Sequence, residues 1–477
     1  MLINIKYSTR PQKVTERICQ VAECFGIGID ENIEHVILDN YEFDESANVV
    51  YITGDSGGGK SSLLKELKKY YEVEDFDFDT NSDTAIIDLV GDSFSEALNI
   101  LSKVGLGEAR LFIKPYKYLS DGQKYRFQLG MMLYKKQKVL CIDEFTSFLD
   151  RTNASVVAYN MQKVCRRNGI KLIVATAHSD LEEFLNPDMI IDFGSDEDEV
   201  VTRHREVDVN YNPFKKDLKI EDGTKEDFYK LIKYHYKGHK YVPGTKAIYK
   251  LTYKDKLVGI VTYGGASRML NGRNTYFNKF YMTERGYAKM TEVNKDFVAA
   301  TRCVISPAFR AIGLGSYLME NTACKFDVPF VEAIAVMSNY NKFIQKGKFL
   351  DVGINESKKT ADSKQRIIEL LDKYGYSYDF LGSQEYCQEI IDNIPHDEIM
   401  KAFYPSIRSG LYIRKGLDLD KKEIFELELD ASLLQMCKIG ITRYMLYPNP
   451  NKTVQCPNCG HYHSIEYECH FCNKSEE

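Results

Sequence analysis

The chain has 477 residues, with 63 Lys and Arg against 69 Asp and Glu, and a formal net charge of −6. This length exceeds what one hydrophobic core supports, so we expect about two to four domains. A hydrophobic share of 44% and a charged share of 28% are ordinary for soluble globular domains, and they exclude a disordered chain, a collagen and a coiled-coil filament. The mild acidity argues against bulk electrostatic attraction to nucleic acid, although a local basic face stays open.

The cellular compartment is indicated by the apolar runs and the cysteines. No run of about 18 apolar residues occurs, and the first residues lack the apolar core of a signal peptide, so neither a membrane partner nor secretion is expected. Of the 12 cysteines, eight are scattered singly and four form two C-x-x-C pairs near the C-terminus. This usage indicates a reducing compartment and one metal site. We therefore expect a cytoplasmic protein, in the host cytoplasm if the chain is viral.

The first 205 residues alternate strand and helix patterns. Short apolar runs predict strands, and the pattern at 60–71 predicts a helix. Strands separated by helices imply βαβ units and a parallel sheet, so we expect an α/β fold class. The strands are expected at 35–43, 49–54, 139–145 and 171–178.

A polar stretch at 210–227 predicts a domain boundary because it contains a proline and a glycine among charged residues. Beyond it the α/β pattern begins again, with strands expected at 247–253, 257–264, 300–306 and 331–337. Residues 360–447 are predicted to be helical first and then rich in strands. The predicted parts are 1–205, 226–380, 381–450 and 451–477.

A phosphate-binding loop is predicted between the strand at 49–54 and the helix at 60–71. Gly54 to Ser61 match G-x-x-x-x-G-K-[ST], whose glycines let backbone N–H groups surround phosphates at a helix N-terminus. Lys60 would reach the β- and γ-phosphates of ATP, and Ser61 would ligate Mg²⁺. The other expected ATP contacts are Asp55, Ser56, Gly57, Gly58, Gly59 and Ser62.

Two carboxylates and a histidine follow later strands. Asp143 and Glu144 end the apolar run at 139–142, and two adjacent acids there are costly unless they serve a cation. Asp143 suits Mg²⁺ coordination, and Glu144 suits polarising an attacking water. His178 ends the next strand and could contact the γ-phosphate. Upstream, Leu119-Ser-Asp-Gly-Gln123 precedes a predicted helix at 124–136.

These elements, in this order, resemble the ABC-type ATPase family over about residues 30–195. The segment 119–123 resembles its signature LSGGQ, and the segment 147–150 resembles its D-loop. The resemblance makes Glu144 the catalytic glutamate and His178 the switch histidine. In this family two domains sandwich two ATPs, which implies an ATP-dependent homodimer. The signature and D-loop contacts to ATP would come from Ser120, Gly122, Gln123 and Asp150.

The chain departs from this family in three ways. Only about 60 residues separate Ser61 from Ser120, so the helical subdomain must be reduced. No glutamine lies between Ser61 and Gly122, so the Q-loop that couples nucleotide to membrane domains is missing, and a transporter role is disfavoured. Asp121 replaces a glycine near the expected phosphates, so its carboxylate must point away to avoid like-charge repulsion.

A second anion-binding turn is predicted at 303–320. The strand is followed by Pro307, by Arg310-x-x-Gly313-x-Gly315 and by an amphipathic helix. This pattern resembles motif A of the GNAT N-acetyltransferase superfamily over residues 226–350, where the turn binds the pyrophosphate of acetyl-CoA. Fusions of this kind occur in phages and archaea. The resemblance implies acyl-CoA contacts from Val304, Ile305, Arg310, Ala311, Ile312, Gly313, Leu314, Gly315, Ser316 and Asn341.

The acyl-transfer candidates each have a structural alternative. Tyr340 occupies the region of the family's general acid, and it is equally well explained as a packing tyrosine. Glu332 and Glu292 are candidate bases, although a surface position is favoured for each. His235 and His239 are either at the substrate mouth or in a polar loop, and the loop is favoured. The basic stretch at 267–273 leaves nucleic acid open as a substrate.

A metal centre is predicted at the C-terminus. Cys456, Cys459, Cys469 and Cys472 give C-x₂-C-x₉-C-x₂-C, and four thiolates suit tetrahedral Zn²⁺. A segment this short builds no core of its own, so the metal would supply its folding energy. Four protein ligands leave no open position, which predicts a structural zinc ribbon.

The predicted protein is therefore a soluble fusion of a P-loop ABC-type ATPase head, a GNAT-like α/β domain and a small Cys₄ zinc ribbon. We expect ATP hydrolysis coupled to acyl transfer from acetyl-CoA, or another acyl-CoA, to nucleic acid or protein. Two alternatives stay open. One is a phage-type enzyme that modifies nucleic-acid bases with the GNAT fold, and the other is a non-enzymatic ATP-gated binding protein with a degenerate GNAT domain.

Overall fold

The computed structural model describes residues 1–8, 13–29, 34–74, 79, 81–194, 200–235, 244–411, 417–438, 440–470 and 472. The chain forms two compact units. Unit 1 comprises 1–240, 249–260 and 304–315, and unit 2 comprises 241–248, 261–303 and 316–477. This division differs from the predicted four parts because it passes through strands of the second sheet. No described helix has the length and apolarity that a membrane crossing requires.

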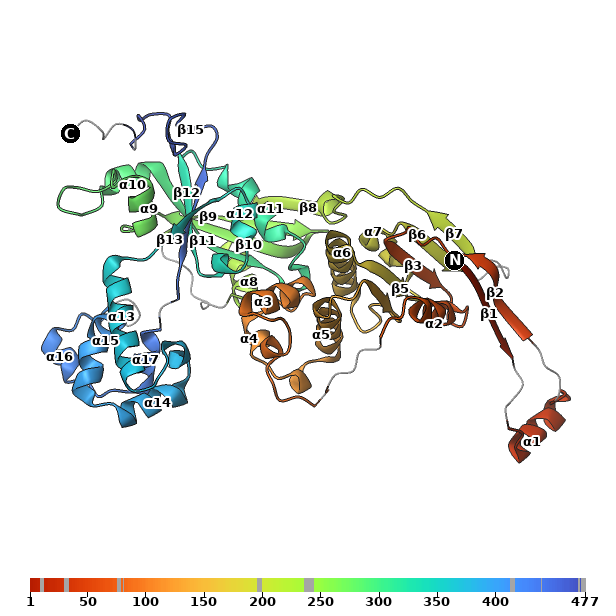
Figure 1. Ribbon diagram of the computed structural model, residues 1–477. Helices are drawn as coiled ribbons and strands as arrows, with labels where there is room; N and C mark the ends of the chain where they lie inside the picture. The colour runs from red at the N-terminus through yellow and green to blue at the C-terminus, as the bar shows by residue number, and fades with distance from the viewer. Residues whose placement is uncertain are drawn as a thin grey trace. The chain divides into compact units, whose positions relative to one another are not determined.

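Unit 1 is built on a five-stranded sheet in the order β4-β5-β3-β6-β7 (Figure 1). Strands β4, β5, β3 and β6 pair in parallel, and β7 pairs antiparallel with β6. The βαβ prediction is confirmed for β3, β4 and β5, whereas the strand predicted at 35–43 lies outside this sheet, and β6 and β7 were not predicted. The strand bounds are β3 Val49–Gly54, β4 Val139–Ile142, β5 Lys171–Ala175, β6 Met189–Phe193 and β7 Val201–His204.

Both faces of the four parallel strands are buried, which explains the continuous apolar runs in these strands. Val49 and Tyr51 of β3 face a core that contains α3, α5 and α6, whereas Val50 and Ile52 face a core with α2, β1 and β2. The bounds of the unit 1 helices are α2 Lys60–Tyr70, α3 Phe94–Lys103, α4 Ala109–Phe112, α5 Asp121–Tyr134, α6 Arg151–Asn168, α7 Glu182–Leu185 and α8 Lys225–Ile232.

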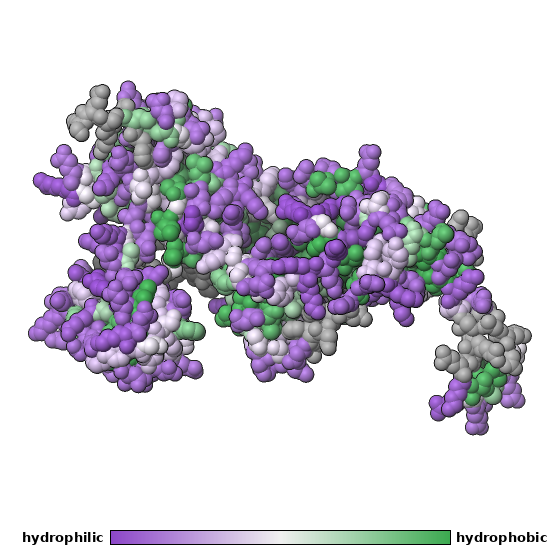
Figure 2. Space-filling view, in the orientation of Figure 1, coloured by the Kyte–Doolittle hydropathy of each residue, from purple (hydrophilic) through white to green (hydrophobic). Residues whose placement is uncertain are grey.

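The N-terminal region forms a two-stranded antiparallel sheet of β1 (Leu2–Ser8) and β2 (Glu34–Glu42). Helix α1 (Glu16–Phe25) lies between them in sequence, and none of its residues is buried. Val21 and Phe25 are 49% and 77% exposed, and Figure 2 shows apolar residues gathered on this helix. The helix therefore presents its apolar side to solvent.

The predicted boundary at 210–227 carries structure. It contains the buried Phe214, which is 1% exposed, and the strand β8 (Leu218–Asp222). The Phe214 ring lies between 5.1 and 6.5 Å from the ring centroids of Tyr159, Phe184, Tyr253 and Phe309. All five rings belong to unit 1, so this segment is part of a core and not a linker.

A seven-stranded sheet has the order β13-β14-β12-β11-β10-β9-β8. Strand β11 pairs in parallel with β12, and β14 lies antiparallel between β12 and β13. The predicted strands of this region are confirmed. Their bounds are β9 Thr245–Tyr253, β10 Lys256–Gly265, β11 Phe297–Ile305, β12 Phe330–Ala335, β13 Leu350–Ile354 and β14 Arg443–Pro448. The associated helices are α9 Asn271–Tyr276, α10 Met290–Asp296, α11 Leu314–Ala323 and α12 Phe343–Lys346.

A helical body is inserted between β13 and β14 in unit 2, and it has its own hydrophobic core (Figure 1). It consists of α13 Lys358–Lys373, the 3₁₀ segment η7 Tyr378–Gly382, α14 Gln384–Asn393, α15 His396–Gly410, α16 Lys421–Phe425 and α17 Ala431–Met436. The predicted boundary at 380 falls inside this body. The strand-rich pattern expected before 447 is limited to β14. After β14, the chain ends in the hairpin β15 Thr453–Gln455 and β16 Tyr462–Ser464.

Candidate functional site

The three segments predicted to handle ATP follow three neighbouring parallel strands. The phosphate loop follows β3, the acidic pair follows β4, and His178 lies shortly after β5. The register pairs Ile52 with Ala175 and Ile142 with Val174, so the strands end at similar heights. Because the carboxyl ends of parallel strands meet at one edge of a sheet, the topology gathers these segments at that edge.

The phosphate loop needs glycine at two positions. Gly54 has φ 119°, and a Cβ there would lie 2.1 Å from the carbonyl oxygen of Phe193. Gly59 has φ 108° and caps α2, and a Cβ there would lie 2.4 Å from the Cγ2 atom of Ile37. Only a residue without Cβ fits either place. Gly57, with φ 87°, faces open space.

Lys60 is enclosed by this loop. Its side chain is 7% exposed, and Nζ donates hydrogen bonds to the carbonyl oxygens of Gly54 at 2.8 Å and Asp55 at 2.5 Å. A buried cation and the N-terminus of α2 both favour a phosphate anion. Ser61 is exposed in the first turn of α2, where its hydroxyl is available to a metal ion. The residues therefore fit a nucleotide phosphate with Mg²⁺. The remaining loop residues Asp55, Ser56 and Gly58 are exposed, and Ser62 is half-buried.

The acidic pair stands in a strained, exposed turn. Glu144 has φ 46° and Thr146 has φ 66°. The Asp143 carboxylate accepts a hydrogen bond from the Glu144 backbone N–H at 2.9 Å, and Glu144 accepts one from the Ser147 hydroxyl at 2.8 Å. The Tyr125 hydroxyl accepts the Thr146 N–H at 2.9 Å. These bonds hold both carboxylates at the surface, where they can reach a ligand.

The histidine segment is tied to the sheet and to the D-loop. The His178 backbone N–H donates to the Thr176 hydroxyl at 3.3 Å, and its carbonyl oxygen accepts the Tyr51 hydroxyl. Arg151, the first residue of α6, forms two hydrogen bonds with the Asp180 carboxylate, one of them at 2.8 Å. Asp150 caps α6 by accepting backbone N–H groups of the next turn. The D-loop and the histidine segment are thus braced within one chain.

The signature segment caps its own helix. The Ser120 hydroxyl accepts the Gln123 N–H at 3.4 Å, and the Gln123 side chain accepts the Ser120 N–H at 3.1 Å. Asp121 lies in the first turn of α5, where the helix dipole favours a carboxylate. A Cβ at Gly122 would lie 3.3 Å from the carbonyl oxygen of Phe148, so this glycine is close to the D-loop.

The predicted acyl-CoA residues are divided between the units. Val304, Ile305, Arg310, Ala311, Ile312, Gly313, Leu314 and Gly315 belong to unit 1, whereas Ser316 and Asn341 belong to unit 2. Ala311 and Gly313 have φ of 68° and 87°, which makes the sharp turn expected before a helix. In unit 2, the Ser316 hydroxyl donates to the Phe343 carbonyl oxygen, and Asn341 accepts the Phe343 N–H.

Arg310 is engaged by carbonyl oxygens of its own unit. Its guanidinium donates to Gly107 at 2.8 Å, to Ile305 at 3.2 Å and to Tyr234 at 3.4 Å. The backbone after it is also held, because Asn212 donates to the Ile312 carbonyl oxygen at 3.4 Å. The arginine side chain is therefore committed to the protein interior, and an anion at this turn would meet backbone N–H groups.

Glu332 is the clearest correction, since the surface position favoured for it is wrong. Its side chain is 1% exposed and contacts Arg273, also 1% exposed, through Nη1 at 3.3 Å. Tyr444 donates to the carboxylate at 3.2 Å, and so does the Ser267 N–H. Burial raises the pKa of Glu332 despite the neighbouring guanidinium. Because Arg273 is enclosed, it is not available to nucleic acid.

The other acyl-transfer candidates lie apart from this network. Tyr340 is 43% exposed after the 3₁₀ turn at 337–339, and Glu292 is half-buried in the first turn of α10. His235 ends a described segment, and His239 lies outside the described residues.

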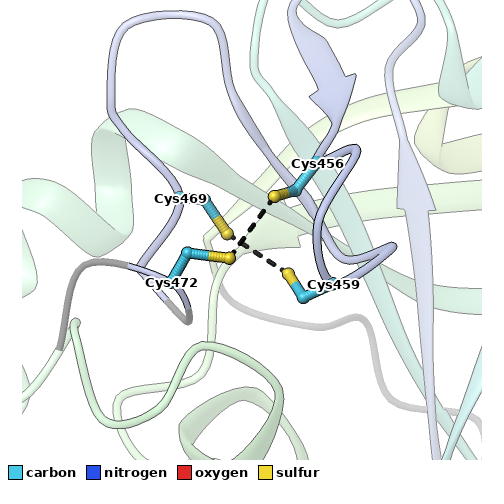
Figure 3. A group of neighbouring side chains, drawn as sticks. All are labelled: Cys456, Cys459, Cys469 and Cys472. Carbon is cyan, nitrogen blue, oxygen red and sulfur yellow. Dashed lines mark hydrogen bonds between the residues drawn. The ribbon is translucent and has the colours of Figure 1, made fainter. Parts of the chain in front are cut away.

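The four predicted metal ligands come together (Figure 3). Their sulfur atoms all lie within 4.8 Å of one another, with 3.6 Å between Cys456 and Cys472 and 3.4 Å between Cys459 and Cys469. Tetrahedral Zn²⁺ with Zn–S bonds of about 2.3 Å places sulfurs roughly 3.8 Å apart, so the cluster fits zinc. Backbone N–H groups of Cys459 and Asn458 lower the pKa of the Cys456 thiol to about 6, which favours its thiolate.

The cysteine ribbon packs on aromatic residues of unit 2. His470 stacks on Phe280 with 3.6 Å between ring centroids, and burial lowers the pKa of this histidine to about 4. The Tyr276 hydroxyl accepts the Tyr462 N–H at 2.9 Å. Outside this core, Lys295 pairs with Glu466 at 2.6 Å. The sequence predicted the metal ligands, but it carried no signal for these docking partners.

Several residues that shape the nucleotide site were also missed. Ile37 and Phe193 bracket the phosphate loop, and Tyr125 and Tyr51 position the acidic turn and the histidine segment. The sequence offers one signal for such residues, namely a tyrosine within a buried strand, as in the run at 49–54, because a buried hydroxyl needs a hydrogen-bond partner.

No family model matches the chain. It is 26% identical over 196 residues to the alpha-hemolysin translocation ATP-binding protein HlyB of Escherichia coli, covering 33% of this chain and 27% of that protein. It is 35% identical over 85 residues to the phosphonates import ATP-binding protein PhnC 1 of Trichodesmium erythraeum, covering 18% of this chain and 33% of that protein. The chain thus spans about a quarter to a third of the length of these relatives. Among solved structures, cbiO1 from Clostridium perfringens, part of an ABC transporter complex, gives a TM-score of 0.26 at 21% identity, over 33% of this chain and 78% of that one.

Two independent observations agree on the first part of the chain. The phosphate loop, acidic pair and histidine segment follow three neighbouring strands of one sheet, the signature segment precedes the acidic pair in the chain, and the sequence relatives are ATP-binding proteins. The chain therefore carries an ABC-ATPase-type nucleotide-binding domain.

Proposed function

We propose that unit 1 binds ATP with Mg²⁺ and hydrolyses it. The observation that carries this proposal is the loop from Gly54 to Lys60, where two glycines admit no Cβ and a buried ammonium group is held at the loop mouth. Lys60 would exchange its two carbonyl partners for phosphate oxygens of the nucleotide. That exchange costs little, because both partners are loop carbonyls that water can satisfy in the open site.

The acidic turn would supply the chemistry of hydrolysis. Glu144 would accept the proton of the attacking water, and the Ser147 hydroxyl keeps its carboxylate oriented. Mg²⁺ held by Ser61 and Asp143 would neutralise charge on the phosphate oxygens. His178 would donate a hydrogen bond to the γ-phosphate, since Tyr51 and Thr176 fix the backbone on which it is carried.

The same site favours an ATP-dependent homodimer. Each chain holds one phosphate loop and one signature segment, and the signature is capped on its own helix at Ser120. In this proposal Ser120, Gly122 and Gln123 of one chain, with Asp150, complete the phosphate site of its partner. The D-loop residue Phe148 is 64% exposed, which leaves an aromatic ring available to such a partner.

The test is sedimentation of Glu144→Gln with ATP. Glutamine keeps the shape of the turn but cannot take a proton, so we expect slow hydrolysis and a stable dimer with ATP and not with ADP. The double variant with Lys60→Ala should stay monomeric, because it loses phosphate contact. A Glu144→Gln protein that sediments alike with and without ATP, or that hydrolyses ATP at the wild-type rate, would contradict the proposal.

We further propose that the seven-stranded sheet is GNAT-like and binds an acyl-CoA. Two observations support this. The parallel pairing of β11 with β12 ends at Ala300 and Ala333, although β11 continues to Ile305, so backbone groups of β11 are left for the amides of the CoA arm. The turn before α11 has Gly313 at φ 87° with open space around it. Tyr340 is the candidate acid for the thiolate leaving group.

Acetyl-CoA titration tests this second activity. Gly313→Glu puts a carboxylate beside the expected pyrophosphate, and Gly286→Glu is the matched control, since Gly286 has φ 79° and equally open surroundings. We expect saturable binding by the wild type and by Gly286→Glu, and loss in Gly313→Glu. Absent binding by the wild type would favour the alternative of an ATP-gated binding protein without acyl transfer.

The acceptor is proposed to be a macromolecule, either protein or nucleic acid, in the cytoplasm. The burial of Arg273 removes one argument for base modification, because a buried arginine is not available to nucleic acid. Mass spectrometry of nucleic acid and protein from cells with wild-type or Glu144→Gln protein separates the two: altered bases favour modification of nucleic acid, and acylated lysines or N-termini favour a protein substrate.

The cysteine cluster is proposed to hold a structural Zn²⁺. All four positions of a tetrahedral ion are filled by Cys456, Cys459, Cys469 and Cys472, so no position is left for a substrate. The ion would hold the hairpin β15–β16 in its docked place on Tyr276 and Phe280.

A further inference from the structure

A hollow lies on the helical body of unit 2, apart from every site described above. It has a volume of about 530 Å³ and is lined by Asp372, Gly375, Tyr376, Ser377, Phe380 and Tyr386. These residues come from the end of α13, the 3₁₀ segment η7 and the start of α14. The volume is within the range of sites that take small ligands or single side chains.

Three aromatic rings form the walls of this hollow, and they are not parallel. The Tyr376 and Tyr386 rings lie 5.5 Å apart at 78°, and the Phe380 and Tyr386 rings lie 5.3 Å apart at 49°. The face of an aromatic ring carries negative charge, so inclined rings that line one hollow can together attract a cation. A planar guanidinium stacks flat on a single ring, whereas a round cation contacts several inclined rings at once.

The rings are held in place by hydrogen bonds at their edges. The Tyr386 hydroxyl accepts the Ser377 backbone N–H at 2.6 Å, and the Tyr376 hydroxyl donates to the Glu389 carbonyl oxygen at 3.4 Å. Phe380 has no such anchor and is nevertheless 62% exposed. A large apolar ring kept at the surface beside two fixed rings is an arrangement that a bound group would cover.

The charge at the hollow is negative. Asp372 is exposed at its rim, and within the described part of the chain no Lys or Arg pairs with its carboxylate or stacks on the three rings. The neighbouring Asp379 is already paired with Lys438 at 3.1 Å. One unpaired carboxylate beside three aromatic faces complements a cation that is weakly hydrated, because such a cation loses little when it leaves water.

We propose that this hollow binds a quaternary ammonium group carried on a polypeptide, namely the side chain of a trimethylated lysine. The trimethylammonium head would lie among Tyr376, Phe380 and Tyr386, with Asp372 balancing its charge. The alkyl stem and the flanking backbone account for a hollow larger than the head group alone. The site would let this protein engage a modified basic protein through unit 2.

The test is a titration of the full-length protein with three matched peptides by calorimetry. One carries trimethyllysine, one carries unmodified lysine, and one carries the neutral isostere in which carbon replaces the ammonium nitrogen. We expect the trimethyllysine peptide to bind at least about fivefold more tightly than either of the others, because each cation–π contact with a partly exposed ring contributes about 0.5–1 kcal/mol. Equal binding of the neutral isostere would overturn the proposal, since it would show an apolar groove without charge recognition.

Single substitutions test whether the trimethyllysine peptide binds at this hollow. Phe380→Leu keeps an apolar surface residue and removes a ring, and it should weaken binding about three- to fivefold. Tyr376→Phe keeps the ring and should leave binding within about twofold, whereas Asp372→Asn should weaken it and reduce its dependence on salt. The matched control is Phe94→Leu in unit 1, where the ring is 55% exposed, and it should bind as the wild type does. If Phe380→Leu binds as tightly as Phe94→Leu does, the site is not the one proposed.

A further titration distinguishes a trimethyllysine side chain from a free small-molecule cation as the ligand. Free choline offers the same trimethylammonium head without a peptide. We expect it to bind at least tenfold more weakly than the trimethyllysine peptide, because it lacks the stem and backbone contacts. Equal affinity for choline would overturn the assignment to a polypeptide side chain.

Discussion

Replacing Gly54 with alanine tests the reasoning on the phosphate loop most directly. The new Cβ would lie 2.1 Å from the Phe193 carbonyl oxygen, and real Cβ atoms essentially never approach closer than 3.0 Å, so the loop and β6 must separate by about 1 Å. The hydrogen bond from the Asp55 N–H to the same oxygen, now 3.2 Å, would be lost. Since φ is 119°, the alanine is also strained where it stands.

The expected magnitude follows from these terms. Backbone strain at a φ of this kind costs about 1–2 kcal/mol, and a lost hydrogen bond costs about 1 kcal/mol. The sum, about 2–3 kcal/mol, corresponds to a loss of ATP affinity of roughly 30- to 150-fold. Gly57→Ala is the matched control, because Gly57 also has a positive φ, of 87°, but a Cβ there meets no atom within 4 Å. It should lose roughly five- to thirtyfold, from strain alone, and less than Gly54→Ala does.

The assay is equilibrium binding of a fluorescent ATP analogue to the full-length variants, with circular dichroism to show that each is folded. The reasoning would be refuted if Gly54→Ala bound nucleotide within about fivefold of the wild type. It would be refuted equally if the two alanine variants lost the same affinity, because the contact with Phe193 would then have no effect.

Three other predictions concern unit 2. Arg273→Met leaves Glu332 buried without its cation and should destabilise β12 by about 3–5 kcal/mol, as measured by hydrogen exchange. The double variant with Glu332→Gln should recover most of this loss. Absence of recovery would show that the two side chains are not coupled. Burial raises the pKa of Asp296 above its ordinary 3.8, so the folded protein loses stability as the pH rises through the raised pKa and the carboxyl ionises. Asp296→Asn should therefore stabilise unit 2 at pH 7 but not near pH 4. Thermal melts at both pH values test this. Removal of Zn²⁺ by a chelator should expose the amides of 453–464 to exchange and release one metal ion per chain, and unchanged protection would argue against a structural metal.

The sequence was most informative where a local pattern dictates local geometry. The loop at Gly54 to Ser61 and the cysteine pairs could be predicted because each depends on residue type at fixed spacing, and the strands around them because buried parallel strands are continuous apolar runs. Their surroundings could not be predicted in the same way. Ile37 and Phe193 reach the loop through tertiary packing, which leaves no periodic signal in a single sequence.

Charged residues were misjudged for a related reason. A surface position was favoured for Glu332, yet its carboxylate is buried, where Arg273 from 59 positions upstream and Tyr444 satisfy it. A pair so distant in sequence is invisible without the fold. The basic stretch at 267–273 was open as a nucleic-acid contact by the same reasoning, whereas its last arginine serves the interior.

The segment at 210–227 shows how composition can mislead about domain boundaries. Its proline, glycine and charges are typical of a linker, but one residue, Phe214, contacts Tyr159 of α6 and Phe309 directly before the turn at Arg310. Helix α6 starts at the D-loop of the nucleotide site, and the Arg310 guanidinium is held by the Gly107 carbonyl oxygen between α3 and α4. Both contacts lie inside unit 1, so the predicted acyl-CoA turn is packed into the core of the nucleotide-binding unit. The resemblance to two families suggested two domains joined in series, whereas packing makes this turn a structural part of the first.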